Sequence, residues 1–216
     1  LTYDYGSLMH YWPSGFSKNG RPVIVSKNPE YQSTMGSRIL SFRDISTMNE
    51  LYECKKKCDT NAVKCYNGGY PHPRDCSKCL CPLGLTGRQC IERPTDSVSS
   101  TCGKSLWTAN TTKTFTGQVG DFSLRDEPFF CHFWLMAPLG SHITATIKKI
   151  SGPCSEGCMQ GGIEFKWQKD TFRNGKTGTR YCCVGDEGRT IKSESNFMPI
   201  IAYNSNGATK FTIEYS

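Results

Sequence analysis

The residues best suited to chemistry stand in one short stretch, Tyr3-Asp4-Tyr5-Gly6-Ser7-Leu8-Met9-His10-Tyr11. Its end brings a thioether, an imidazole and a phenol together. A phenol can coordinate a metal ion through oxygen, and its O–H can stabilise charge that appears in a transition state. On spacing alone, however, a tyrosine beside Trp12 is more often an aromatic of the core. The stretch is therefore a candidate site that needs support from the rest of the chain.

The histidines do not supply the rest of such a site. The chain has four, His10, His72, His132 and His142, and no pair has the H-x-x-x-H spacing that places two imidazoles on one helical face. The sequence also contains no G-x-S-x-G elbow and no recognisable arrangement of nucleophile and base. We therefore expect this chain to be inactive when it is alone.

The stretch nevertheless resembles the Met-turn of the astacin family of zinc endopeptidases, whose members carry an S-x-M-H-Y element, here Ser7 to Tyr11. In that family the ligand motif H-E-x-x-H-x-x-G-x-x-H comes upstream of the turn, and here only two residues precede Tyr3. The resemblance implies zinc as cofactor, with ligands outside this chain. It also implies that Tyr11 is a resting zinc ligand and catalytic oxyanion donor, and that Met9 packs beneath the metal. No signal peptide is visible, and we expect a C-terminal fragment of a longer secreted precursor.

Residues 1–54 are the part that this resemblance covers, and they predict the C-terminal lobe of a metzincin-type α+β protease domain without its zinc helix. Ser41 is a suitable N-cap, and Asp44 stands three residues later, near the free N–H groups of a first helical turn. The apolar face of the predicted helix consists of Phe42, Ile45, Met48 and Tyr52. We expect this face to dock on a core that is absent, and residues 1–54 to be poorly protected from hydrogen exchange.

Further residues of this segment are candidates for specific roles. Arg38 and Arg43 lie where astacins wall the primed side of the cleft, and either could pair with acidic substrate side chains, although exposed arginines more often have no such role. His10 is expected to be hydrogen-bonded within the turn. Cys54 closes the segment, and the resemblance implies a disulfide between Cys54 and the missing start of the domain.

The thirteen cysteines favour disulfides over zinc clusters. Only Cys76 and Cys79 have the C-x-x-C spacing of a zinc knuckle, and Cys81 follows at once. A disulfide framework implies an oxidising compartment and hence a secreted, extracellular protein. The odd number leaves one cysteine for a partner outside this chain. The sequon Asn110-Thr111-Thr112 is a candidate glycosylation site that agrees with this location.

Residues 55–92 resemble a small, disulfide-rich EGF-like module. The run from Cys79 to Cys90 matches the family's C-x-C-P-x-G-x-x-G-x-x-C element, and Cys65-Tyr66-Asn67-Gly68-Gly69 matches its C-x-N-G-G turn. The resemblance implies the disulfides Cys58–Cys76, Cys65–Cys79 and Cys81–Cys90. Because five residues displace Cys76 from its usual place, the pairs Cys58–Cys79 and Cys65–Cys76 remain an alternative. Lys55-Lys56-Lys57 replaces the acidic lead-in of calcium-binding members, so calcium is not expected.

Residues 93–101 have the composition of a linker, and residues 102–216 show short strands with period-two alternation that predict an all-β sandwich. This segment resembles a CUB domain at Cys102-Gly103, at Cys131-His132-Phe133-Trp134 and at Pro199 to Asn204. The resemblance implies the disulfide Cys102–Cys131. Two further disulfides are expected among four cysteines, with their pairing open: Cys154, Cys158, Cys182 and Cys183.

Composition excludes two other classes of partner. The net charge is +7, but the basic residues are scattered, whereas a nucleic-acid binder gathers them into a patch. No apolar run approaches the ~18 residues of a membrane span. The chain thus predicts a mixed multidomain protein, part of a nematode-type secreted zinc metalloendopeptidase that cleaves extracellular proteins, with matrix or cuticle collagen as candidate substrates. The EGF-like and CUB modules would dock substrates or partners. The alternative is a non-catalytic extracellular EGF-CUB binding protein.

Overall fold

The computed structural model describes residues 2–58, 62–95, 102–108, 111–169 and 174–216. The predicted glycosylation site at Asn110 and most of the predicted linker lie outside these residues. The N-terminal part holds the helices η1 (Pro29–Thr34), α1 (Phe42–Leu51) and η2 (Cys54–Lys57), followed by the hairpin β1 (Tyr70–His72) and β2 (Asp75–Leu80). The remaining strands are β3 (Ser105–Trp107), β4 (Lys113–Val119), β5 (Leu124–Met136), β6 (Thr144–Ser151), β7 (Gly161–Phe165), β8 (Thr179–Tyr181), β9 (Thr190–Lys192), β10 (Phe197–Asn206) and β11 (Thr209–Tyr215). The short helices η3 (Glu156–Cys158) and η4 (Val184–Asp186) lie between them.

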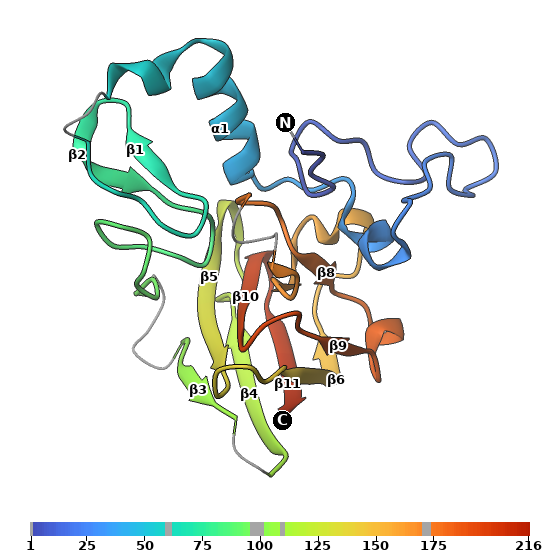
Figure 1. Ribbon diagram of the computed structural model, residues 1–216. Coiled ribbons are helices and arrows are strands. Elements are labelled where there is room, and N and C mark those ends of the chain that lie inside the picture. The colour runs from blue at the N-terminus through green and yellow to red at the C-terminus, as the bar shows by residue number, and fades with distance from the viewer. Residues whose placement is uncertain (1, 59–61, 96–101, 109–110, 170–173) are drawn as a thin grey trace.

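Strands β3 to β11 form two sheets packed face to face, which is the all-β sandwich predicted for this part of the chain (Figure 1). The first sheet has the order β3-β5-β10-β7-β8 and the second the order β4-β11-β6-β9. All pairs are antiparallel except β3 with β5. Alternate residues of both sheets fill the core between them, among them Leu135, Ile163 and Ile213. This is the arrangement that the period-two patterns predict.

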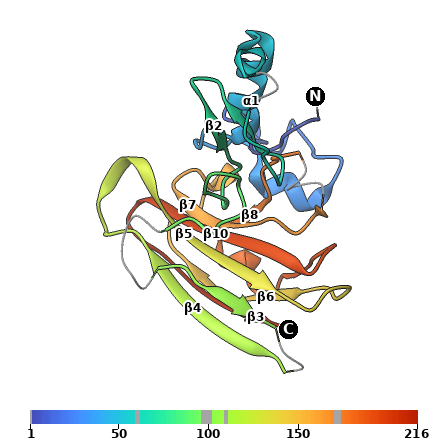
Figure 2. The same ribbon diagram turned by 60° about the vertical axis from the view of Figure 1, so that its left-hand side comes forward.

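The first sheet is apolar on both faces because both are covered. On β5, Cys131, Phe133 and Leu135 point into the sandwich core, whereas Trp134 packs on the outer side with Leu85. The indole N–H of Trp134 donates to the carbonyl of Gly84 at 3.0 Å. Figure 2 shows the N-terminal segments lying on this outer side, away from the second sheet. A strand buried on both faces loses its polar-apolar alternation, which accounts for the continuous apolar run at the end of β5.

Six disulfides cross-link the chain. The unit built on β1 and β2 contains Cys58–Cys76, Cys65–Cys79 and Cys81–Cys90. The displaced cysteine therefore leaves the first-to-third and second-to-fourth pairing intact. The sandwich contains Cys102–Cys131, Cys154–Cys183 and Cys158–Cys182. The adjacent cysteines after β8 thus bond to two different positions around η3.

Residues 2–54 pack against the sandwich, which differs from the expectation that they would lack a core. Met35 is fully buried there, and Thr34 is buried beside β8. The helix start at Ser41 is confirmed, because its side chain and that of Asp44 form a capping box. Phe42 is buried, but Met48 and Tyr52 are exposed. The apolar face of α1 is thus covered at its beginning and open further along.

Candidate functional site

Residues 3–11 form two successive tight turns. The N–H of Ser7 donates to the carbonyl of Asp4 at 3.3 Å, and that of His10 to the carbonyl of Ser7 at 3.1 Å. The His10 ring is hydrogen-bonded locally, with Nδ1 2.6 Å from the carbonyl oxygen of Tyr11 and Nε2 bonded to the hydroxyl of Tyr3. This agrees with the expectation that His10 serves the turn itself. Burial raises the pKa of Tyr3, and neighbouring Tyr5 adds to the effect.

Asp44 joins these turns to helix α1. Its carboxylate accepts the hydroxyl of Ser7 at 2.5 Å and the N–H of Leu8 at 2.9 Å. The same carboxylate accepts the N–H of Ser41 at 3.1 Å and so closes the capping box. One side chain therefore fixes both the helix start and the turn that carries Met9.

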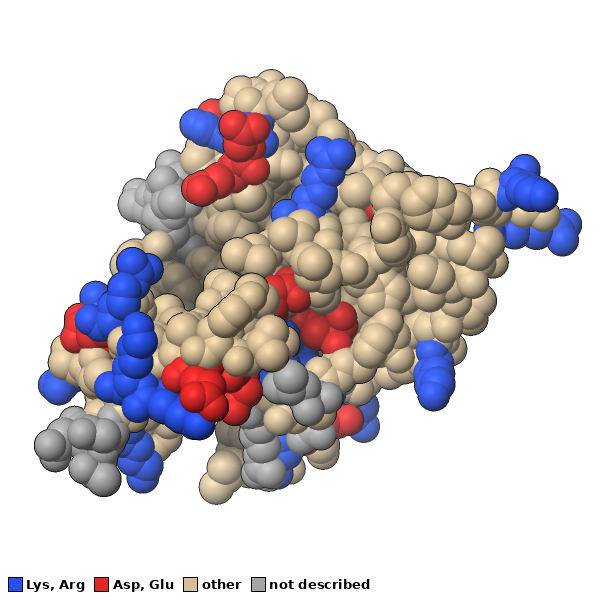
Figure 3. All heavy atoms as spheres, turned by 90° about the horizontal axis from the view of Figure 1, so that it is seen from above, with Lys and Arg blue, Asp and Glu red and all other residues tan. Residues whose placement is uncertain are grey.

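A groove of about 850 Å³ lies between the turn and α1. Its walls include Tyr3, Met9, Leu40, Ile45 and Met48. Figure 3 looks onto this end of the molecule, whose surface is largely uncharged, with basic and acidic side chains interspersed. The groove is therefore a mainly apolar surface beside the candidate site.

The structure brings only some of the predicted site residues together. Met9 and Arg43 both line the groove. Tyr11 stands outside it, 58% exposed, and packs on Trp12 and Phe16 instead. Met9 is 83% exposed, so its thioether has no cover in this arrangement.

The two arginines of the predicted cleft differ in their surroundings. Arg38 is exposed and lies away from the groove walls. Arg43 is half-buried, and its guanidinium donates to the carbonyl of Asn174 at 3.3 Å. Arg43 is thus tied to the sandwich side of the molecule, whereas Arg38 is free to meet solvent.

The residues present do not by themselves fit a zinc site. Within the described residues, no three His, Cys, Asp or Glu side chains stand close enough to hold a metal ion. Among the cysteines that the structure describes, Cys54 is the one outside a disulfide. Tyr11 and Met9 are accessible, but they would need partners from elsewhere to form a metal centre.

Sequence reasoning missed a buried charge cluster beneath residues 33–37. Glu164 on β7 accepts from Arg180 Nε on β8 at 3.0 Å and from Lys166 Nζ at 3.0 Å. All three side chains are almost completely buried. Burial alone would raise the pKa of Glu164, but the charges of Lys166 and Arg180 and the N–H of Gly178 favour the carboxylate and hold the pKa at about 2.

Asp4 is a second site residue that the sequence did not reveal. It is 9% exposed, and its carboxylate accepts the N–H and the hydroxyl of Thr177, both at 3.1 Å. In the sequence, Asp4 is a single acidic residue between two tyrosines, and this pattern does not predict that its side chain is buried. Its partner lies 173 residues away in the sequence, so no local pattern could have predicted the contact.

Comparison with known proteins supports the resemblance at the N-terminus. Residues 1–53 match the family model described as Astacin, a peptidase family. The whole chain is 38% identical over 218 residues to the zinc metalloproteinase nas-31 of Caenorhabditis elegans, covering 34% of that protein. It is 36% identical over 230 residues to the zinc metalloproteinase nas-27 of the same organism, covering 53% of it. The chain spans about a third to a half of the length of the curated relatives it matches.

Solved structures give a weaker likeness. The CUB1-EGF-CUB2 domains of rat MASP-1 match 76% of this chain and 55% of their own length, with 15% identity and a TM-score of 0.37. The MASP-1 CUB2 domain bound to Ca²⁺ matches 50% of this chain and 95% of its own length, with 16% identity and a TM-score of 0.35. No helix in the described part of the chain is long and apolar enough to cross a membrane.

Proposed function

We propose that this chain, which belongs to the astacin family through residues 1–53, is the C-terminal portion of a secreted zinc-dependent endopeptidase that cleaves extracellular proteins. The observation that carries this proposal is the seating of the S-x-M-H-Y turn. Asp44 holds Ser7 and Leu8 against the start of α1, while Met9 and Tyr11 remain exposed beside an apolar groove. An exposed methionine and tyrosine at this place are available to a centre completed by other residues.

Zinc would be held mainly by side chains outside the described residues, and when bound it would supply Lewis-acid chemistry. Tyr11 is the residue of this chain that we assign to the centre. Its phenol can coordinate through oxygen, and its O–H can donate to an oxyanion on the substrate. Arg43 lines the groove and Arg38 is exposed beyond it, so either arginine can pair with an acidic side chain of a substrate.

We assign substrate or partner docking to the two following units, an EGF-like module at residues 55–92 and a CUB domain at residues 102–216. The three disulfides around β1 and β2 support the first assignment. The two-sheet sandwich with its Cys102–Cys131 bond supports the second. The disulfides also favour an extracellular location, where matrix or cuticle collagen is a candidate substrate.

The test is to express the longest native protein that contains this chain and to measure hydrolysis of a denatured collagen. We expect zinc-dependent hydrolysis, and a kcat about 10²- to 10³-fold lower in the Tyr11→Phe variant, because one oxyanion donor is lost. Tyr66→Phe, in the disulfide-linked unit, serves as the control and should leave kcat unchanged. Full activity after zinc is removed with a chelator would refute the proposal of a zinc-dependent peptidase. A wild-type kcat in Tyr11→Phe would refute the role of Tyr11.

A non-catalytic extracellular binding protein is the second candidate, and one observation favours it. Residues 2–54 pack on the sandwich, and Met35 is fully buried there, so this segment stabilises the folded chain without any catalytic role. Reading the coding sequence upstream of Leu1 separates the two candidates, because an in-frame H-E-x-x-H supports the peptidase and a signal peptide directly before Leu1 supports the binding protein.

A further inference from the structure

The sandwich contacts the candidate site through a buried carboxylate, that of Asp4, and this group of contacts is called the clamp below. Thr177, in the segment before β8, donates its N–H to one carboxylate oxygen of Asp4 and its hydroxyl to the other, both at 3.1 Å. The N–H of Gly6 donates to the same carboxylate at 3.3 Å. Asp4 and Thr177 are 9% and 5% exposed. Hydrogen bonds to a buried charged group are among the stronger ones in proteins.

Close packing leaves the clamp little room to move. A Cβ at Gly6 would lie 2.3 Å from the Thr177 side chain, so the turn backbone rests directly on that residue. Asp4 begins the first of the two tight turns, and the second ends at His10, directly before Tyr11. Whatever fixes Asp4 therefore fixes the start of the segment that carries Met9 and Tyr11.

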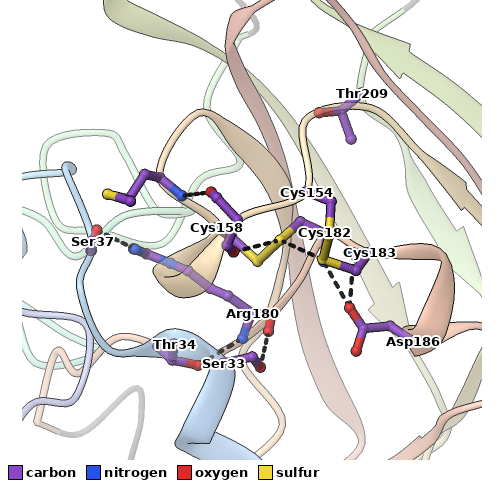
Figure 4. Close-up of a disulfide and its surroundings, with 12 residues drawn as sticks. Ser33, Thr34, Ser37, Cys154, Cys158, Arg180, Cys182, Cys183, Asp186 and Thr209 are labelled. Carbon is purple, nitrogen blue, oxygen red and sulfur yellow. Dashed lines mark hydrogen bonds between the residues drawn. A yellow bond between two sulfur atoms is a disulfide. The ribbon is translucent and has the colours of Figure 1, made fainter. Parts of the chain in front are cut away.

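A second group of contacts holds residues 33–37, the segment that leads into α1. Helix α1 then contacts the turn through Asp44. The backbone N–H of Arg180 donates to the hydroxyl of Thr34 at 3.0 Å, and the hydroxyl of Ser33 donates to the carbonyl of Arg180 at 2.7 Å. The guanidinium of Arg180 donates to the hydroxyl of Ser37 (Figure 4). The disulfide Cys158–Cys182 lies beside these contacts in the same view.

Two glycines of the sandwich also lie in close contact with the N-terminal segment. A Cβ at Gly157 would lie 2.5 Å from the carbonyl carbon of Gly36, and one at Gly175 would lie 2.3 Å from the ring of Phe42. These contacts place the beginning of α1, and with it Asp44, on the sandwich. The turn is thus held at Asp4 directly and at Ser7 through Asp44.

We propose that the sandwich is a structural part of the catalytic site, and that Thr177 is a positioning residue that sets the turn bearing Tyr11. This inference rests on the proposed peptidase function for its catalytic consequence but not for the contact itself. It gives the sandwich a role beyond docking, because a domain joined only by a hinge would not donate to a buried carboxylate of the site. The sandwich therefore cannot be removed without loosening the turn.

The first test uses hydrogen exchange of the whole 216-residue chain. In Thr177→Val, which keeps the shape but removes the hydroxyl, amides of residues 4–11 should exchange about tenfold faster, as expected for the loss of one hydrogen bond to a charged group. Thr177→Ser keeps the hydroxyl and should exchange within about twofold of wild type. Thr212→Val, on the second sheet, should not change residues 4–11. Equal exchange in Thr177→Val and wild type would overturn the proposal, as would failure of Thr177→Ser to restore protection.

The second test uses the longest native protein and separates this inference from the proposed function. Thr177→Val should lower kcat about tenfold while KM and zinc content stay near the wild-type values, and Thr177→Ser should restore kcat. An unchanged kcat in Thr177→Val, with an active wild type, overturns the positioning role alone. A wild type without hydrolysis refutes the peptidase, while the exchange experiment still decides whether the sandwich holds the turn.

Discussion

Glu164 and Arg180 stand directly opposite each other on the paired strands β7 and β8, and their side chains form an ion pair of 3.0 Å with 1% exposure on either side. Lys166 and the N–H of Gly178 satisfy the other carboxylate oxygen. Arg180 extends from this pair to Ser37. The outer face of the sandwich therefore carries a complete polar network under residues 33–37, where an isolated sheet would meet water.

Removing the carboxylate charge should destabilise the protein strongly. In Glu164→Gln, the buried Arg180 and Lys166 lose the carboxylate that they both contact, and breaking a buried pair from one side costs about 3–5 kcal/mol. Urea unfolding followed by tryptophan fluorescence measures this free energy. The matched control is Glu214→Gln, which breaks the exposed pair with Lys148 and should cost less than about 1 kcal/mol. Equal midpoints for the two variants would contradict the role of the network.

His132 should make stability depend on pH in the mildly acidic range. Burial lowers the pKa of His132 to about 4, and the charge of Arg93 adds to the effect. The pKa of this histidine is thus lower in the folded state than in the unfolded state, where it is about 6.5. The resulting contribution to the free energy of unfolding is fully present above about pH 6.5, and it is lost as the pH falls toward 4, because the unfolded state then binds a proton that the folded state does not. We expect the free energy of unfolding to fall by roughly 2–3 kcal/mol across this window.

The variant His132→Gln checks the origin of that pH dependence. It removes the titrating ring but keeps a polar side chain on the outer face of β5. Chemical unfolding of both proteins at several pH values between 7 and 4 gives the comparison. The slope between pH 6.5 and 4 should be smaller in His132→Gln than in wild type. Parallel pH profiles would show that other groups carry the dependence.

The strands and the start of α1 could be predicted because their signals are local. Alternation of side chains within about five to eight residues sets which face of a strand is buried, and Ser41 with Asp44 is a local capping signal. The sequence at the end of β5 also indicates that both faces of this strand are covered. Phe130 and Trp134 alternate with Phe133 and Leu135, and apolar residues on both faces indicate cover on both sides.

The contacts between residues 2–54 and the sandwich could not be predicted from the sequence. Asp4 meets Thr177 and Ser37 meets Arg180 across more than 140 residues, and no periodic pattern records such pairs. Glu164 and Lys166 alternate with apolar residues in the way that solvent-facing residues do, so the local pattern gives no sign that they are buried. Burial arises only once another segment covers that face. The expectation that this segment would have no core to dock on is wrong for this reason.

The meeting of Gly157 with Gly36 offers a direct test of this interface. Gly157 has φ +68° and a Cβ there would lie 2.5 Å from Gly36, whereas Gly188 has φ +84° and open space around it. Alanine at either position bears the strain of the left-handed backbone, about 1–2 kcal/mol, but only Gly157→Ala must also push two backbones apart. We expect Gly157→Ala to lower the free energy of unfolding by at least about 1 kcal/mol more than Gly188→Ala. Gly157→Ala should also speed hydrogen exchange of residues 33–37, and equal effects of the two variants on stability and exchange would mean that residues 33–37 do not rest on the sandwich in solution.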